Sequence, residues 1–124
     1  VLAEKAGVSR LAFLDFMNNS VMGSIFTRYK TNAFVNLDWT TTFTPALMRK
    51  DLDLGLASAR ELNVAMPITA ATREALQSHF GAAMLKGDPE AYLEQDFSAV
   101  LETVALASGF VLKSEETSYP TGLE

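Results

Sequence analysis

The sequence contains no cysteine, which excludes disulfide bonds and any chemistry that needs a thiolate. It also lacks a run of about 20 apolar residues, the length that a membrane-spanning helix requires. The first residues, VLAEKAGVSR, do not have the charged-then-apolar layout of a signal peptide. These absences predict a soluble chain with no membrane partner, and they are compatible with a cytoplasmic location.

Positive charge is scarce and scattered along the chain. Ten lysine and arginine residues stand against 15 acidic residues, which gives a net charge of −5. Proteins that bind nucleic acid usually present clustered lysine and arginine side chains to the phosphates. The composition therefore predicts no nucleic-acid partner.

Histidine is represented by His79 alone. No cysteine or carboxylate stands near it at the spacing of metal ligands, so the sequence predicts no metal site. A glycine-rich phosphate loop after a strand is also missing, so this chain does not by itself form a dinucleotide cradle of the Rossmann kind. We expect His79 to lie on the surface of a helix.

Apolar residues, in contrast, are abundant and recur at helical spacing. Of the 124 residues, 48% are hydrophobic and 20% are charged, which is typical of one compact globular domain. Strand signals are almost absent. The pattern predicts an all-α domain of five to seven helices over residues 1–110, followed by a flexible tail over 111–124 in which Leu123 and Glu124 are interpreted as a cloning remnant.

The expected helix ends follow from capping residues. The first helix is expected to be the end of a longer helix and to stop at Gly7, the second to cover 10–19 after the cap Ser9, and the third to run from the cap Ser24 to about Lys30. The fourth is expected over 45–62, with Thr44 as the cap, Pro45 in the first position and Asn63 as the stop. The last three are expected from the cap Thr69 to Gly87, from Asp88 and Pro89 to about Glu94, and from the cap Asp96 to Gly109. Residues 31–43 are expected as an irregular connector.

The helix over 45–62 is apolar around most of its circumference. At about 100° per residue, one arc carries Met48, Leu52, Gly55, Leu56, Ala59 and Leu62, and a second stripe carries Leu47, Leu54 and Ser58. Asp51 falls on the second stripe and Lys50 lies about 100° away, so the two side chains are not helical partners. The pattern predicts a nearly buried helix on which each charge needs a partner from elsewhere. A structural ion pair and a functional site explain this pattern equally well.

Three stretches carry a family resemblance: LAEKAGVS, FTPALMRKDLDLGLASARELNVAMPITAATREAL and QDFSAVLE. Together they resemble the C-terminal helical domain of the β-hydroxyacid dehydrogenase family, which includes 3-hydroxyisobutyrate dehydrogenase, tartronate semialdehyde reductase and the glyoxylate and succinic semialdehyde reductases. The likeness runs from Val1 to about Gly109. Its most specific element is Phe43, seven residues before Lys50 and Asp51.

The resemblance implies a 6-phosphogluconate dehydrogenase C-terminal-like fold that serves as the substrate and dimerisation domain of an NAD- or NADP-dependent enzyme. In that family an N-terminal Rossmann domain holds the cofactor and a long helix, carrying the catalytic lysine, leads into the helical domain. The resemblance places Lys50 against the cofactor, gives Asp51 a supporting role in the active site and makes Phe43 part of the nicotinamide and substrate pocket. It also implies that the protein forms a homodimer and that the whole enzyme interconverts a small 3-hydroxy acid and its semialdehyde.

Because the catalytic lysine and the Rossmann domain are not among these residues, we expect the chain alone to be inactive. Two alternatives stay open. An imine-reductase-like oxidoreductase has the same architecture, and the pair of Lys50 and Asp51 argues only moderately against it. A non-catalytic helical oligomerisation module arises if such a domain has lost its nucleotide-binding half.

Overall fold

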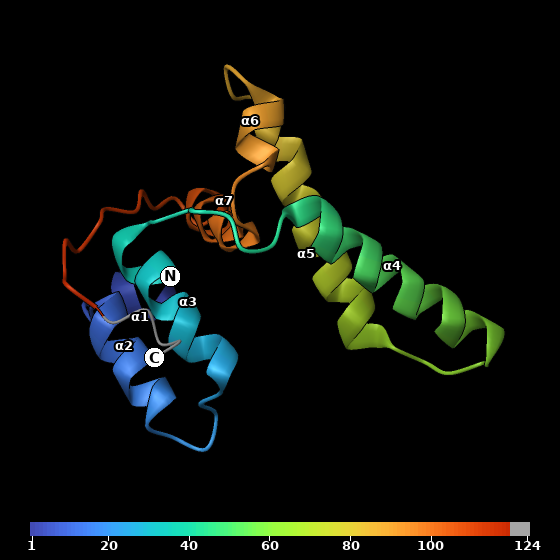
Figure 1. Cartoon of the computed structure of the whole chain (residues 1–124), viewed down its shortest axis with the longest axis horizontal. Coiled ribbons are helices and arrows are strands. Elements are labelled where there is room, and N and C mark those ends of the chain that lie inside the picture. Colours follow the sequence, from blue (N-terminus) through green and yellow to red (C-terminus); the bar gives the residue numbers. More distant parts are fainter. Residues whose placement is uncertain (120–124) are drawn as a thin grey trace. The chain divides into compact units, whose positions relative to one another are not determined.

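The computed structural model describes residues 1–119, and all regular secondary structure in this range is helical (Figure 1). The all-α prediction is therefore confirmed. The elements are α1 (Leu2–Lys5), α2 (Arg10–Asn18), α3 (Ile25–Asn36), α4 (Pro45–Glu61), α5 (Pro67–Ala83), α6 (Pro89–Leu93), the 3₁₀ helix η1 (Phe97–Ala99) and α7 (Val100–Ala107). None of these helices is both long and apolar enough to cross a membrane. The prediction for Leu123 and Glu124 lies outside the described residues.

The contacts divide the chain into two compact units. The first unit comprises Val1–Trp39 together with the chain from Val104 onward, and the second comprises Thr40–Thr103. Helix α7 begins in the second unit and ends in the first.

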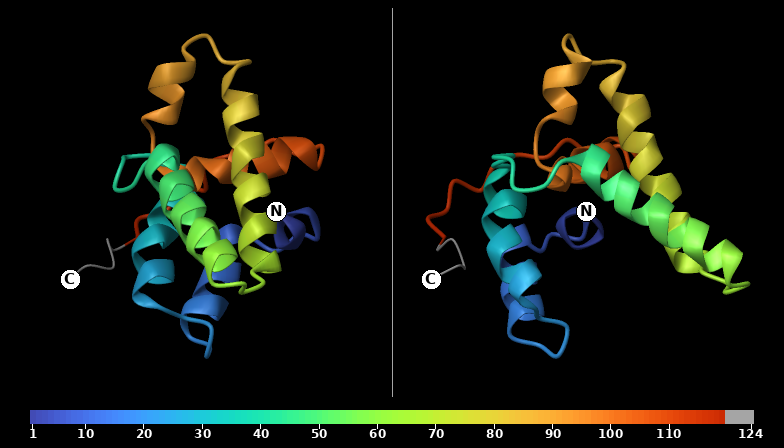
Figure 2. Two further views of the ribbon diagram at one scale, coloured as in Figure 1. Left: turned by 90° about the vertical axis from the view of Figure 1, so that its right-hand side faces the viewer. Right: turned by 45° about the vertical axis from the view of Figure 1, so that its right-hand side comes forward.

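Arg10 is the main polar anchor inside the first unit, in which α2 and α3 pack side by side (Figure 2). Its side chain is 5% exposed. The guanidinium donates hydrogen bonds to the carbonyls of Phe34 at 2.6 Å, Val35 at 3.0 Å and Lys113, and it forms an ion pair with Glu4 at 2.5 Å. Because these groups come from three separate segments, one cation ties the unit together.

Helix α3 is longer than the sequence predicts. It continues past Lys30 to Asn36, so the first six residues of the expected connector are helical. Thr31 and Val35 are fully buried, and the Thr31 hydroxyl accepts a hydrogen bond from the Asn18 amide at 2.8 Å. Burial against α2 therefore outweighs the low helix propensity of this segment.

The segment after α7 has no regular secondary structure over its described part, and Glu115 joins it to α2 and α3. The Glu115 carboxylate accepts the N–H groups of Arg10 at 2.7 Å and Leu11 at 3.1 Å. These are free donors in the first turn of α2, so Glu115 acts as a second cap there. The Glu115 N–H donates to the Val35 carbonyl at 3.1 Å. The acceptor that caps α2 comes from 105 residues away, which no local pattern reveals.

The second unit is built on a hairpin of α4 and α5, which lie alongside each other in every view (Figures 1 and 2). As predicted, Thr44 caps α4, Pro45 occupies its first position and Asn63 adopts a left-handed conformation with φ of 55°. Helix α5, however, starts at Pro67 instead of after Thr69, because proline is preset for the first helical position. It also ends at Ala83, before Gly87.

The remaining caps agree with the sequence. The Asp88 carboxylate accepts the N–H of Ala91 at 3.0 Å and starts α6. The Asp96 carboxylate accepts the N–H of Ser98 at 3.0 Å and starts η1, which leads directly into α7. Gly109 ends α7 with a positive φ of 65°, a conformation in which glycine carries no steric penalty.

Candidate functional site

Phe43 lies in the connector directly before α4. Its ring meets the ring of Phe97 edge to face, with centroids 6.0 Å apart, and its carbonyl accepts the Phe97 N–H at 2.9 Å. Its own N–H donates to the buried Asp96 carboxylate at 3.2 Å. The aromatic side chain is half-buried, so one part of it packs inside the second unit and another part faces outward.

Helix α4 is buried on one side only. Pro45 and Ala59 are buried, and Met48, Leu52 and Leu56 are half-buried at the same helical spacing, which is the first predicted arc without Gly55 and Leu62. The second stripe is open, with Leu47 45% and Leu54 60% exposed. The prediction of a nearly buried helix is therefore wrong, because α4 packs mainly against α5 and its second stripe stays exposed.

Lys50 and Asp51 form an ion pair with each other. The Lys50 amine lies 2.9 Å from an oxygen of Asp51, and the two side chains are 58% and 53% exposed. The prediction that each needs a partner outside the helix is wrong. The four-carbon stem of lysine is long and flexible enough to turn back to its neighbour, although the backbone directs the two Cβ atoms 100° apart.

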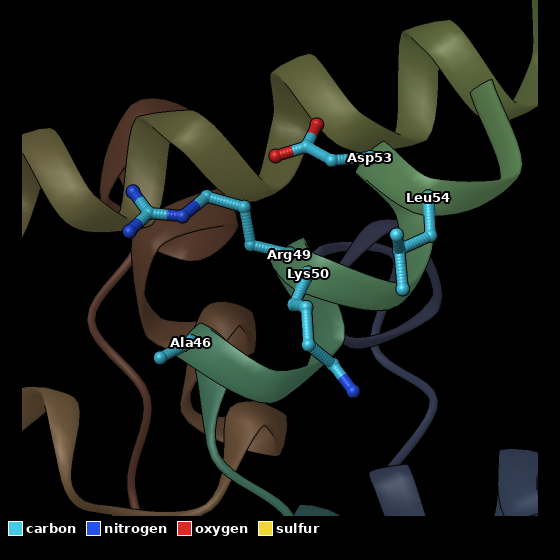
Figure 3. A pocket seen from close by; sticks show the side chains of 5 residues that line it. All are labelled: Ala46, Arg49, Lys50, Asp53 and Leu54. Atoms are coloured by element: carbon cyan, nitrogen blue, oxygen red, sulfur yellow. The ribbon is translucent and has the colours of Figure 1, made fainter. Parts of the chain in front are cut away.

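A shallow depression surrounds Lys50 and is lined by Ala46, Arg49, Lys50, Asp53 and Leu54, all from α4 (Figure 3). In Figure 3 the amine of Lys50 points away from the side chains of Arg49 and Asp53, which extend toward α5. The Arg49 guanidinium lies 3.8 Å from the centroid of the Phe80 ring. The cation of Lys50 is thus directed outward, while that of Arg49 is used within the hairpin.

Asp53 is the other charged residue of this depression, and its role is structural. Its carboxylate pairs with the Arg73 guanidinium of α5 at 2.8 Å. The hydrogen bond from Arg73 is the main reason why the pKa of Asp53 lies below its usual value. Asp53 therefore links α4 to α5 as an anion, whereas Asp51 pairs only along the outer face.

His79 was predicted on the helix surface and is instead fully buried. Its Nδ1 lies 2.8 Å from the Thr103 hydroxyl, its ring centroid is 5.0 Å from that of Tyr92, and its Nε2 has no hydrogen-bond partner. Burial is the main cause that lowers the pKa of His79, because a buried site disfavours the charged form of the ring. The signal was present in the sequence, because His79 stands three residues after Leu76 and four before Ala83, on the inner face of α5.

The buried histidine has charged neighbours from the elements around it. The Tyr92 hydroxyl donates to the Glu102 carboxylate at 2.8 Å, and Lys86 lies 3.7 Å from that carboxylate. Burial, followed by the hydrogen bond to Glu102, raises the pKa of Tyr92. Among residues 1–119, no three histidine, cysteine or acidic side chains are grouped so as to hold a metal ion.

The outer face of α4 offers chemistry suited to an anionic ligand. Lys50 presents an exposed ammonium in the N-terminal half of α4. Phe43 offers an aromatic surface directly before the same helix. The depression is open and formed by one helix, so a ligand bound there needs a second surface to enclose it.

A family model described as the NAD-binding domain of NADP-dependent 3-hydroxyisobutyrate dehydrogenase matches residues 1–104. The match covers most of the chain and includes Phe43, Lys50, Asp51 and Asp96. No curated protein matches the chain.

Proposed function

Because the chain belongs to the family of the NAD-binding domain of NADP-dependent 3-hydroxyisobutyrate dehydrogenase, we propose that it is the helical domain of a cytoplasmic dehydrogenase that interconverts a small 3-hydroxy acid and its semialdehyde. The family uses NAD(P). The observation that carries the proposal is the outward-facing cation of Lys50 on the open side of α4, inside the matched region. An upstream Rossmann domain would hold the nucleotide and enclose it against this side.

Each predicted site residue has a physical role in the proposal. Lys50 contacts anionic oxygens of the cofactor, because it is an exposed ammonium near the positive end of the helix dipole. Asp51 orients the Lys50 amine through their ion pair at 2.9 Å. Phe43 forms an apolar wall beside the nicotinamide and the substrate. The bound cofactor supplies or accepts the hydride.

The proposal includes a homodimer. Large apolar side chains are exposed along α4 and after it, among them Leu47, Leu54, Leu62 and Val64 at 45 to 74% exposure. A large group of exposed apolar side chains usually marks a protein interface. The chain should therefore elute as a dimer at micromolar concentration. A monomeric mass in light scattering over a wide concentration range contradicts this part of the proposal.

Lys50→Ala in the full-length enzyme tests the cofactor contact. We expect the cofactor KM to rise about tenfold with a smaller change in kcat, because a hydrogen bond to a charged group contributes about 1.5 kcal/mol. Lys86→Ala is the matched control, since it removes one positive charge from the same unit. An unchanged cofactor KM in Lys50→Ala overturns the role of Lys50.

The second candidate is the non-catalytic oligomerisation module, and the exposed apolar surface on α4 favours it. It predicts a full-length protein that dimerises and binds no dinucleotide. Titration of NADH and NADPH against the intrinsic fluorescence of the full-length protein distinguishes the two functions.

A further inference from the structure

Asp96 connects two segments of the second unit that are distant in the sequence. Its side chain is fully buried. One carboxylate oxygen accepts the Thr42 N–H at 2.9 Å, the Thr42 hydroxyl at 2.8 Å and the Phe43 N–H at 3.2 Å. The other accepts the Ser98 N–H at 3.0 Å and the Ser98 hydroxyl. The sequence accounts only for the contact to Ser98, which caps η1.

The contacts to Thr42 and Phe43 fix a part of the chain that has no helical hydrogen bonds of its own. Both N–H groups lie before Thr44, the cap of α4, so no earlier turn of helix accepts them. Asp96 supplies that acceptor from 53 residues further along the chain. A buried carboxylate that receives several N–H and O–H donors holds them tightly, because each lost contact leaves a polar group unsatisfied.

We infer that Asp96 is a positioning residue of the proposed cofactor site, because its carboxylate sets the place of Phe43 and of the first turn of α4. The inference rests on the proposed function, since the position of Phe43 and Lys50 matters for binding only if these residues contact the cofactor. Asp96 itself is buried and acts through Phe43. The edge-to-face contact with Phe97, the next residue after Asp96, holds the Phe43 ring from the same side.

Substitutions of Asp96 in the full-length enzyme test this inference. We expect Asp96→Ala to raise the dissociation constant for the dinucleotide five- to tenfold. Asp96→Asn should raise it less than twofold, because the remaining oxygen still accepts from Thr42 and Phe43. The new NH2 group faces the Ser98 N–H, a second donor, so this substitution removes the cap of η1 and its main cost falls on stability. The rate of amide hydrogen exchange at Phe43 should increase slightly in Asp96→Asn and more strongly in Asp96→Ala.

Asp88→Ala is the matched control. It removes another aspartate cap from the same unit, at the start of α6, and does not touch Phe43. We expect it to lower stability and to leave the dissociation constant within twofold of the wild-type value. If Asp88→Ala weakens cofactor binding as much as Asp96→Ala, the effect reflects general loss of stability and the inference is wrong.

A double-mutant cycle separates this inference from the proposed function. Phe43→Ala alone should weaken dinucleotide binding, and adding Asp96→Ala should weaken it little further, because Asp96 acts through Phe43. Additive effects overturn the positioning role. If Phe43→Ala leaves binding unchanged, the proposed role of Phe43 itself fails. If Asp96→Ala does not fold, Asp96→Ser takes its place in the cycle, because the shorter hydroxyl side chain can still cap η1 at Ser98 but no longer reaches Thr42 and Phe43.

Discussion

Each unit contains a buried charged side chain that joins separate segments of it, Arg10 in the first and Asp96 in the second, and the two charges are opposite. In the first unit, the guanidinium of Arg10 collects backbone carbonyls from α3 and from the C-terminal segment. In the second unit, the carboxylate of Asp96 collects backbone N–H groups from the connector before α4 and from η1. A buried cation thus binds several hydrogen-bond acceptors, and a buried anion binds several donors. In the first unit this arrangement stabilises the fold, and in the second it also fixes Phe43, a proposed binding residue.

Among the substitutions that test this comparison, Arg10→Ala is expected to lower stability the most. It removes a buried cation, takes the guanidinium donor from the Phe34 carbonyl and the Glu4 carboxylate, and leaves the Val35 carbonyl with the Glu115 N–H alone among its side-chain and tail donors. We expect the free energy of unfolding to fall by about 3 to 5 kcal/mol, the usual cost of breaking a buried charged cluster. Urea denaturation of the chain measures this. Arg28→Ala, at an exposed position on α3, should change stability by less than about 0.5 kcal/mol.

A smaller effect is expected from pH, and it concerns the second unit. The folded-state pKa of His79 is lowered by burial, so the unfolded chain binds more protons below the ordinary histidine pKa of 6.5. Stability should therefore be fully present above pH 6.5 and should fall as the pH drops through 6.5 toward the folded pKa, because the unfolded chain then takes up the proton first.

His79→Asn is the matched variant for this titration. Asparagine places a polar atom near the position of Nδ1, so the contact to Thr103 is kept while the titrating ring is lost. Denaturation midpoints measured between pH 5 and 8 should depend less on pH in His79→Asn than in the wild type. Equal slopes in the two proteins contradict the assignment of the effect to His79.

The smallest effect on stability is expected from Asp51→Asn. The pair of Lys50 and Asp51 is exposed on both sides, and such pairs contribute less than about 0.5 kcal/mol. Thermal unfolding of the chain should therefore be nearly unchanged. A large loss of stability means that the pair is structural, which weakens the proposed role of α4 in function. A negligible loss sharpens the contrast with Arg10, because these charges then have little value for the fold itself.

The sequence predicts the local features of the fold well. Ser9, Thr44, Asp88 and Asn63 cap or end their helices as expected, because each acts on backbone groups within four residues. The length of α3 and the burial of His79 were predicted wrongly. Both depend on packing against other segments, and burial of Val35 or of the imidazole overrides local propensity.

The candidate site divides in the same way. Phe43, Lys50 and Asp51 follow from the resemblance, and their roles remain proposals. The ion pair of Lys50 with Asp51 was missed, because helical spacing describes Cβ positions and not the reach of a lysine side chain. Asp96 was predicted as a cap alone. Its contacts with Thr42 and Phe43 join residues more than 50 positions apart, and no periodicity contains that information.

The bridge from Asp96 to Phe43 also has a consequence for the order in which the second unit folds. The hairpin of α4 and α5 closes over a short turn at Asn63, whereas the contacts of Asp96 with Thr42 and Phe43 must close loops of 54 and 53 residues. Loop-closure entropy makes contacts between distant residues slower to form than local ones. The hairpin of α4 and α5 is therefore expected to form first. Phe43 becomes fixed only later, when Asp96 has reached it. Refolding followed by pulsed hydrogen exchange would then show the Phe43 amide protected after those in the middle of α4.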